Sequence, residues 1–173
     1  MTLADLFSGG AFLLSFDKFR KSRCCVKLPT PTTRSSEMIE ANGGVVNFIA
    51  ILIPTLMALY YGFRCLFQTE AAITEWGIGA ASEQMVKICG CYALTQGVMY
   101  AIILFTSPAG AWELFAFSTI WAALFLYFSY ATKNSAWAEV EGVNATNEPI
   151  IVSGIMLVVH IYIMSAMSGI IYA

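Results

Sequence analysis

Charged residues are scarce in this sequence of 173 residues. They make up 12% of the chain, whereas a soluble globular domain usually carries about 25%. Hydrophobic residues make up 58%, which leaves little sequence for a separate soluble domain. The nine basic residues do not form a basic face, and this argues against nucleic acid as a partner.

Histidine is nearly absent as well, since His160 is the only one in the chain. A haem held by two histidines of this chain is therefore excluded. The sequence also lacks a Gly-rich phosphate loop, the Cys and His spacing of zinc sites, and a Ser, His and Asp set. We therefore expect a protein without catalytic activity of its own.

The five cysteines do not predict a disulfide framework. Their number is odd, and Cys65, Cys89 and Cys91 lie in or beside apolar segments, where cysteine usually packs as a small apolar residue. On a helix, Cys89 and Cys91 would point about 200° apart, so both cannot easily bind one metal ion.

The main positive feature is a set of four long apolar runs with almost no charge. They are Val45–Phe67, Met85–Phe105, Trp112–Ala131 and Ile150–Ile171. At about 1.5 Å per residue, each is long enough to cross a hydrocarbon core of about 30 Å as a helix. Segments in lipid must satisfy their own backbone groups, which excludes isolated strands. The sequence thus predicts an all-α integral membrane protein, with a four-helix transmembrane bundle in residues 45–173.

Residues 1–44 form a different, N-terminal arm. Leu3–Phe16 is apolar but too short to span a membrane, and the basic segment Asp17–Lys27 follows it. This order predicts a helix in the headgroup layer, with an extended linker over Leu28–Ser36. Six of the nine basic residues lie in the arm, so the positive-inside rule predicts both termini on the cytoplasmic, stromal or matrix side.

Small residues at four-residue intervals predict close helix packing. They are Ala50, Pro54, Ala58 and Gly62 in the first run, Ala93, Gly97 and Ala101 in the second, and Ser165 and Gly169 in the fourth. The third run is rich in aromatic residues instead, which indicates a face for lipid, a pigment or a partner subunit.

His160 lies at the middle of the fourth run, and Gln96 lies at the middle of the second. Polar residues at that depth are costly, so a function is expected. One interpretation is a direct hydrogen bond between Gln96 and His160. The other is a cofactor site, in which His160 is the axial ligand of chlorophyll or another tetrapyrrole metal and Gln96 lies beside it.

Charged residues near the ends of the runs predict ion pairs. Glu83 and Lys87 are four residues apart, a spacing that brings side chains together on a helix. Arg64 is expected to extend towards the lipid headgroups, with Glu70 within reach.

A motif links the first two runs. The first run ends in Tyr60-Tyr61-Gly62-Phe63-Arg64-Cys65-Leu66-Phe67, followed by Glu70 and Trp76-Gly77, and the second carries Gly90 and Gly97. This order resembles the DoxX-like group of small four-helix membrane proteins over about residues 50–130. The resemblance implies a four-helix bundle.

These observations lead to one main functional prediction and one alternative. The main prediction is a non-catalytic small subunit of a larger energy-transducing assembly, photosynthetic or respiratory, in a thylakoid or inner mitochondrial membrane. Its partners would be lipid and other membrane subunits, bound through the N-terminal arm and the third run. The alternative is a stand-alone DoxX-like protein in redox, quinone or lipid handling, with Cys89, Cys91 and His160 as working residues.

Overall fold

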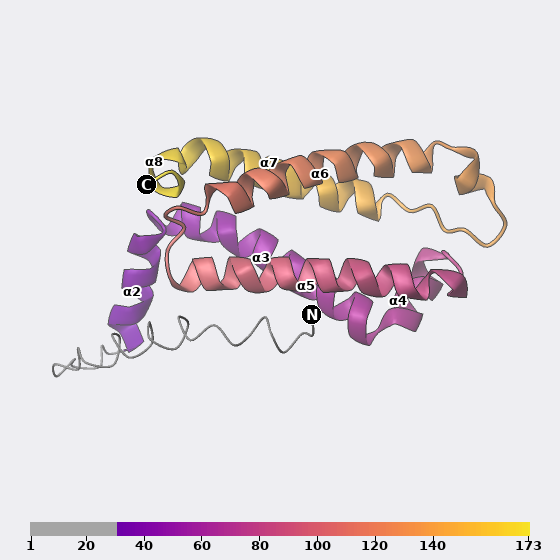
Figure 1. Ribbon diagram of the computed structural model, residues 1–173, viewed down its shortest axis with the longest axis horizontal. Helices are drawn as coiled ribbons and strands as arrows, with labels where there is room; N and C mark the ends of the chain where they lie inside the picture. Colours follow the sequence, from indigo (N-terminus) through magenta and orange to yellow (C-terminus); the bar gives the residue numbers. More distant parts are fainter. Residues whose placement is uncertain (1–30) are drawn as a thin grey trace, which may run out of the picture. The chain divides into compact units, whose positions relative to one another are not determined.

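The structure is a computed structural model, and it describes residues 31–173. Helices are its regular elements, and no strand occurs in this part of the chain. The α-helices are α2 (Pro31–Ala41), α3 (Val45–Phe67), α4 (Thr69–Trp76), α5 (Glu83–Phe105), α6 (Trp112–Lys133), α7 (Glu148–Ala166) and α8 (Ser168–Ile171). Two 3-10 turns, η1 (Ala80–Ser82) and η2 (Ala136–Glu139), lie in the connections (Figure 1).

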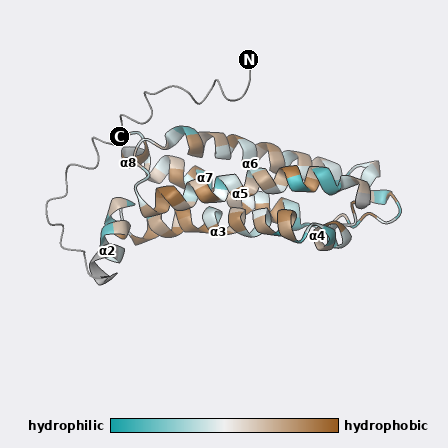
Figure 2. Cartoon of the chain, turned by 60° about the horizontal axis from the view of Figure 1, so that its bottom comes forward, coloured by the Kyte–Doolittle hydropathy of each residue, from teal (hydrophilic) through white to brown (hydrophobic). Residues whose placement is uncertain are grey.

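Four helices in this part of the chain are long and apolar enough to cross a membrane: α3, α5, α6 and α7. Hydrophobic residues dominate all four (Figure 2). The predicted all-α fold with four transmembrane helices is therefore confirmed, and the chain is described below as a multi-pass membrane protein.

The helices differ from the predicted apolar runs mainly where a charged residue lies at the end of a helix. α5 starts at Glu83 and α6 continues to Lys133, because charged residues can remain helical while their heads reach the polar layer. The fourth predicted span ends earlier than expected, at Ala166. Met167 then leaves the helical conformation, with φ −102° and ψ 12°, and α8 follows it.

The prediction of an extended linker over residues 28–36 is wrong from Pro31 onwards, because α2 begins there. Proline is tolerated in a first helical turn, because its missing N–H has no helical acceptor there. The side chain of Asn42, fully buried just after α2, donates to the backbone oxygens of Met38 (2.8 Å) and Leu104 (3.0 Å). It thus ties the end of α2 to α5. The predictions for Leu3–Phe16 and Asp17–Lys27 lie outside the described residues.

The long helices pack as two close pairs, α3 with α5 and α6 with α7 (Figure 1). The first pair approaches through glycines. A Cβ on Gly62 would lie 2.5 Å from the backbone nitrogen of Leu94, and one on Gly97 would lie 2.8 Å from that of Leu59. The small-residue prediction is therefore confirmed for this pair.

The same prediction is wrong for the fourth span. Ser165 is exposed, and a Cβ on Gly169 would meet no atom within 4 Å. Small residues allow a close approach, but a helix needs a partner on that face before the approach can occur.

One apolar core joins the two pairs at the end where α2 lies. It draws on all four spans and α8, and its buried members are Ala50, Ile51, Tyr100, Ile103, Leu104, Phe115, Ile163, Met167 and Ile171. Tyr100 is the only one of these with a polar side-chain group, and that hydroxyl leads into the site described next.

Candidate functional site

A cluster of polar side chains is buried where α5, α6 and α7 meet. Tyr100 and His160 are 0% exposed, Ser118 is 1% exposed and Gln96 is 7% exposed. Gln96 and Tyr100 are four residues apart, so both lie on the same face of α5. Ser118 reaches this point from α6 and His160 from α7.

His160 is held in one neutral tautomer. Its Nδ1 lies 2.6 Å from the carbonyl oxygen of Met156, which can only accept, so Nδ1 carries the proton. Nε2 is then an acceptor, and the hydroxyl of Tyr100 donates to it over 2.6 Å. Both ring nitrogens of His160 are thus hydrogen-bonded within the protein.

The network continues through Gln96 to α6. The Gln96 amide nitrogen donates to the Tyr100 hydroxyl (3.0 Å) and to Ser118 Oγ (2.7 Å). Ser118 in turn donates to the backbone oxygen of Leu114 (2.7 Å). The chain of hydrogen bonds therefore connects three helices and ends at a backbone carbonyl on each side. Such pairing offsets the cost of burying polar groups at membrane depth.

The structure brings together both residues that the sequence singled out, but not in the predicted way. The prediction of a direct hydrogen bond between Gln96 and His160 is wrong, because the Tyr100 hydroxyl lies between the two side chains and bonds to both. Sequence reasoning missed Tyr100 and Ser118. Tyr100 could have been found from its position one helical turn after Gln96.

The tetrapyrrole prediction requires a free ring nitrogen on His160. Ligation through Nε2 would displace the Tyr100 hydroxyl, and the Tyr100 ring is stacked on Phe115 with centroids 5.8 Å apart. The geometry fits a hydrogen-bonding role for Gln96 and His160, and ligation stays a prediction.

The cysteines lie apart from this network. Cys89 and Cys91 are exposed on α5, whereas Cys65 is buried on α3 beside Gly90. Nine residues separate Cys91 from Tyr100, which is roughly 14 Å along a helix. The structure therefore does not bring the cysteines to His160.

A second polar cluster lies at the opposite end of the bundle, around α4. Arg64 is only 8% exposed; it forms an ion pair with Glu75, and its guanidinium lies 5.4 Å from the Trp76 ring centroid. The carboxylate beside Arg64 is Glu75 and not the predicted Glu70, because α4 folds back and presents Glu75. The predicted extension of Arg64 towards the lipid headgroups stays a prediction. The predicted pair of Glu83 and Lys87 is confirmed at 2.5 Å.

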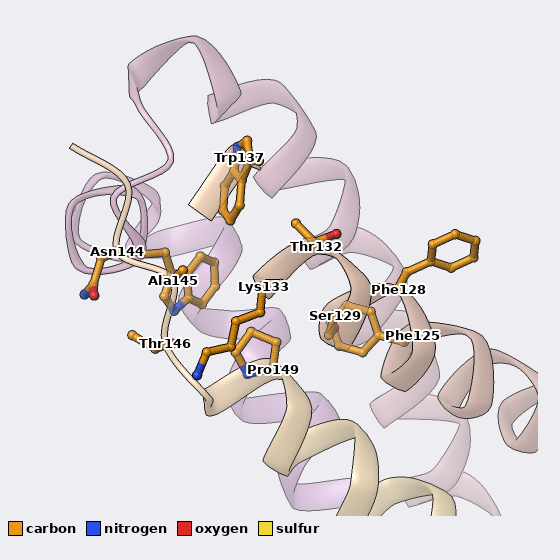
Figure 3. A pocket seen from close by; sticks show the side chains of 11 residues that line it. Phe125, Phe128, Ser129, Thr132, Lys133, Trp137, Asn144, Ala145, Thr146 and Pro149 are labelled. Atoms are coloured by element: carbon orange, nitrogen blue, oxygen red, sulfur yellow. The ribbon is translucent and has the colours of Figure 1, made fainter. Parts of the chain in front are cut away.

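The same end is closed by contacts between distant segments. The Tyr61 hydroxyl donates to Glu148 over 2.6 Å and links α3 to α7. The Asn144 amide donates to the backbone oxygen of Glu75 over 2.9 Å and links the α6–α7 loop to α4. Beside these contacts lies a cavity of about 290 Å³ (Figure 3).

Comparisons with protein-family models, curated proteins and solved structures found no match to this chain. The resemblance to DoxX-like proteins stays a prediction.

Proposed function

We propose that the protein is a non-catalytic membrane subunit that holds helical partners together in a larger energy-transducing assembly. The observation that supports this proposal most directly is the large exposed surface of α6. Only 17% of the α6 span is buried within the described chain, compared with 22% for α7 and 33% for both α3 and α5. α6 is therefore the span with the most surface left for another helix.

The exposed surface of α6 is rich in aromatic side chains. Phe117 is 53% exposed and Tyr127 is 64% exposed, with Ile120 and Leu124 between them on the same face. Aromatic residues are enriched at protein interfaces, where a few of them often supply most of the binding energy. A helical partner from another subunit suits this face.

The network around His160 supports the proposal by fixing α6 in place. Two residues of α6 contact α5: Ser118 forms a hydrogen bond with Gln96, and the Phe115 ring stacks on the Tyr100 ring. A rigid face loses little conformational entropy when a partner binds, which favours affinity. In this proposal the buried polar groups position the docking surface.

The N-terminal arm is proposed as a second contact, since α2 is anchored to α5 through Asn42. A thylakoid or an inner mitochondrial membrane is the proposed compartment, because the assemblies there are built from many small helical subunits. A pigment or haem ligated by His160 would have to displace the Tyr100 hydroxyl from Nε2.

Alanine substitutions on α6 test the docking face. Replacing Phe117, Ile120 and Tyr127 together should lower co-purification with the assembly at least tenfold, because a single interface aromatic can supply about 2 kcal/mol of binding energy and tenfold corresponds to about 1.4 kcal/mol. The measurement is the fraction of protein in the large complex on a native gel.

A matched control lies on α7, where Ile151, Val158 and Ile161 are similarly exposed at 58%, 67% and 52%. Alanine at these three positions should leave assembly unchanged. If the α6 and α7 variants lost assembly equally, the cause would be altered packing against lipid and not loss of a docking face on α6. That result would contradict the proposal.

A further inference from the structure

The cavity beside α4 lies where three segments converge. Its walls come from the end of α4, the last turns of α6, and the loop that leads into α7 (Figure 3). The residues that line it are Trp76, Phe125, Phe128, Ser129, Thr132, Lys133, Trp137, Asn144, Ala145, Thr146 and Pro149. Its volume of about 290 Å³ is large enough for part of an organic molecule.

The lining has two kinds of surface. Four aromatic rings and Pro149 supply an apolar wall, and Phe125 and Phe128 are 37% and 59% exposed, so this wall is open to the surroundings of the helix. Hydroxyl groups and the ammonium of Lys133 supply a polar part. A ligand that fits both surfaces has an apolar chain and a polar head.

The position of the cavity along the membrane normal points to a lipid. Lys133 is the last residue of α6, and α7 starts at Glu148, so the cavity lies where both spans end. Tryptophan and lysine at the ends of spans lie at the level of the lipid headgroups. Phosphate is the anionic group that phospholipids carry at this depth.

Lys133 is suited to bind a phosphate. Among the side chains described in residues 35–173, the ion pairs are Arg64 with Glu75 and Lys87 with Glu83, so Lys133 has no carboxylate partner there. Its ammonium instead contacts the side-chain oxygen of Asn147, a neutral group. Hydrogen bonds between an ammonium and phosphate oxygens are among the stronger ones in proteins.

The cavity is also held open in advance. Asn144 bonds to the backbone of Glu75, and the backbone of Gly77 fits closely against Asn144, where an added Cβ would lie 2.5 Å from the Asn144 nitrogen. The loop therefore stays attached to α4, and little ordering is needed when a ligand enters.

We infer that this cavity binds one glycerophospholipid, with the phosphate on Lys133 and an acyl chain along Phe125 and Phe128. The site does not depend on the proposed subunit role, because it lies at the end of α6 and is built by this chain alone. It would be present whether the protein is an assembly subunit or stands alone.

Native mass spectrometry of the full chain in detergent tests the site. Titration with phosphatidylglycerol should give a retained one-to-one adduct, whereas a galactolipid, which has no phosphate, should bind about tenfold more weakly. Glycerol phosphate should not compete at equal concentration, because it lacks the acyl chain. Equal binding of the galactolipid, or full competition by glycerol phosphate, would overturn the inference.

Variants separate the cavity from the membrane-facing surface in general. Lys133→Gln should weaken phosphatidylglycerol binding about tenfold, to the level of the galactolipid. Lys87→Gln, at the same end of the bundle but outside the cavity, should change nothing. Ser129→Trp should block the cavity with the Lys133 ammonium still present. Unchanged binding in Lys133→Gln or Ser129→Trp, or an equal loss in Lys87→Gln, would contradict a site at this cavity.

Discussion

At the residue scale, the protein treats its buried polar groups in two different ways. Tyr100, on α5, both donates and accepts within the network between Gln96 and His160. Tyr92, two turns earlier on the same helix, has a buried hydroxyl with no hydrogen-bond partner among the described residues, and its ring packs against Phe117 and Trp121. The two tyrosines therefore form a natural comparison.

Tyr100→Phe should destabilise the helix bundle by about 1–3 kcal/mol, because it leaves the acceptor nitrogen of His160 and a donor of Gln96 buried without a partner. The free energy of unfolding in mixed detergent micelles measures this loss. Tyr92→Phe is the control and should change stability little, since it removes a hydroxyl that has no partner. A loss in Tyr92→Phe as large as that in Tyr100→Phe would show that the network contributes no stability.

The same network shows where prediction from sequence stops. Counting residues along each span predicts that Gln96 and His160 lie close together, and the network that joins them through Tyr100 agrees with this. Which side chains meet depends on how each helix is rotated about its axis, and no residue count supplies that rotation. For this reason the sequence does not reveal that Tyr100 lies between Gln96 and His160, or that α4 presents Glu75 instead of Glu70 to Arg64.

At the element scale, the pair of α3 and α5 depends on glycines. Apolar run length was enough to predict the helices, and small-residue spacing was enough to predict close packing of these two. The break at Met167 is not predicted in this way, because the length of the apolar run alone does not place a helix end, although Ser168 and Gly169 directly follow the break.

Gly97→Ala should destabilise the bundle by about 1–3 kcal/mol, because its Cβ would overlap the backbone of Leu59 and force α3 away from α5. Gly154→Ala on α7 is the matched control. An added Cβ there meets no atom within 4 Å, so the change should be neutral or stabilising by up to about 1 kcal/mol, from helix propensity alone. Equal destabilisation by the two substitutions, again measured in mixed micelles, would contradict the close approach of α3 and α5.

At the scale of the whole molecule, residues 35–173 form a helical bundle with one aromatic, largely uncovered span. The polar network fixes α6 from inside, and the exposed aromatic residues point away from the other spans. These two features together favour a subunit that positions neighbouring helices. The aromatic composition of the third run predicts an outward face, and the small buried share of α6 agrees with that prediction. Which side of α6 packs against α7 could be read only from the structure.

The most direct test is the size of the particle that contains this protein in its native membrane. A mild-detergent extract would be separated on a native gel and read by absorbance and mass spectrometry. The subunit proposal predicts migration with a large complex, whose pigment or haem absorbance and other subunits would identify it. Colourless migration near the protein's own 18.9 kDa plus detergent would contradict the proposal and favour the stand-alone, DoxX-like alternative.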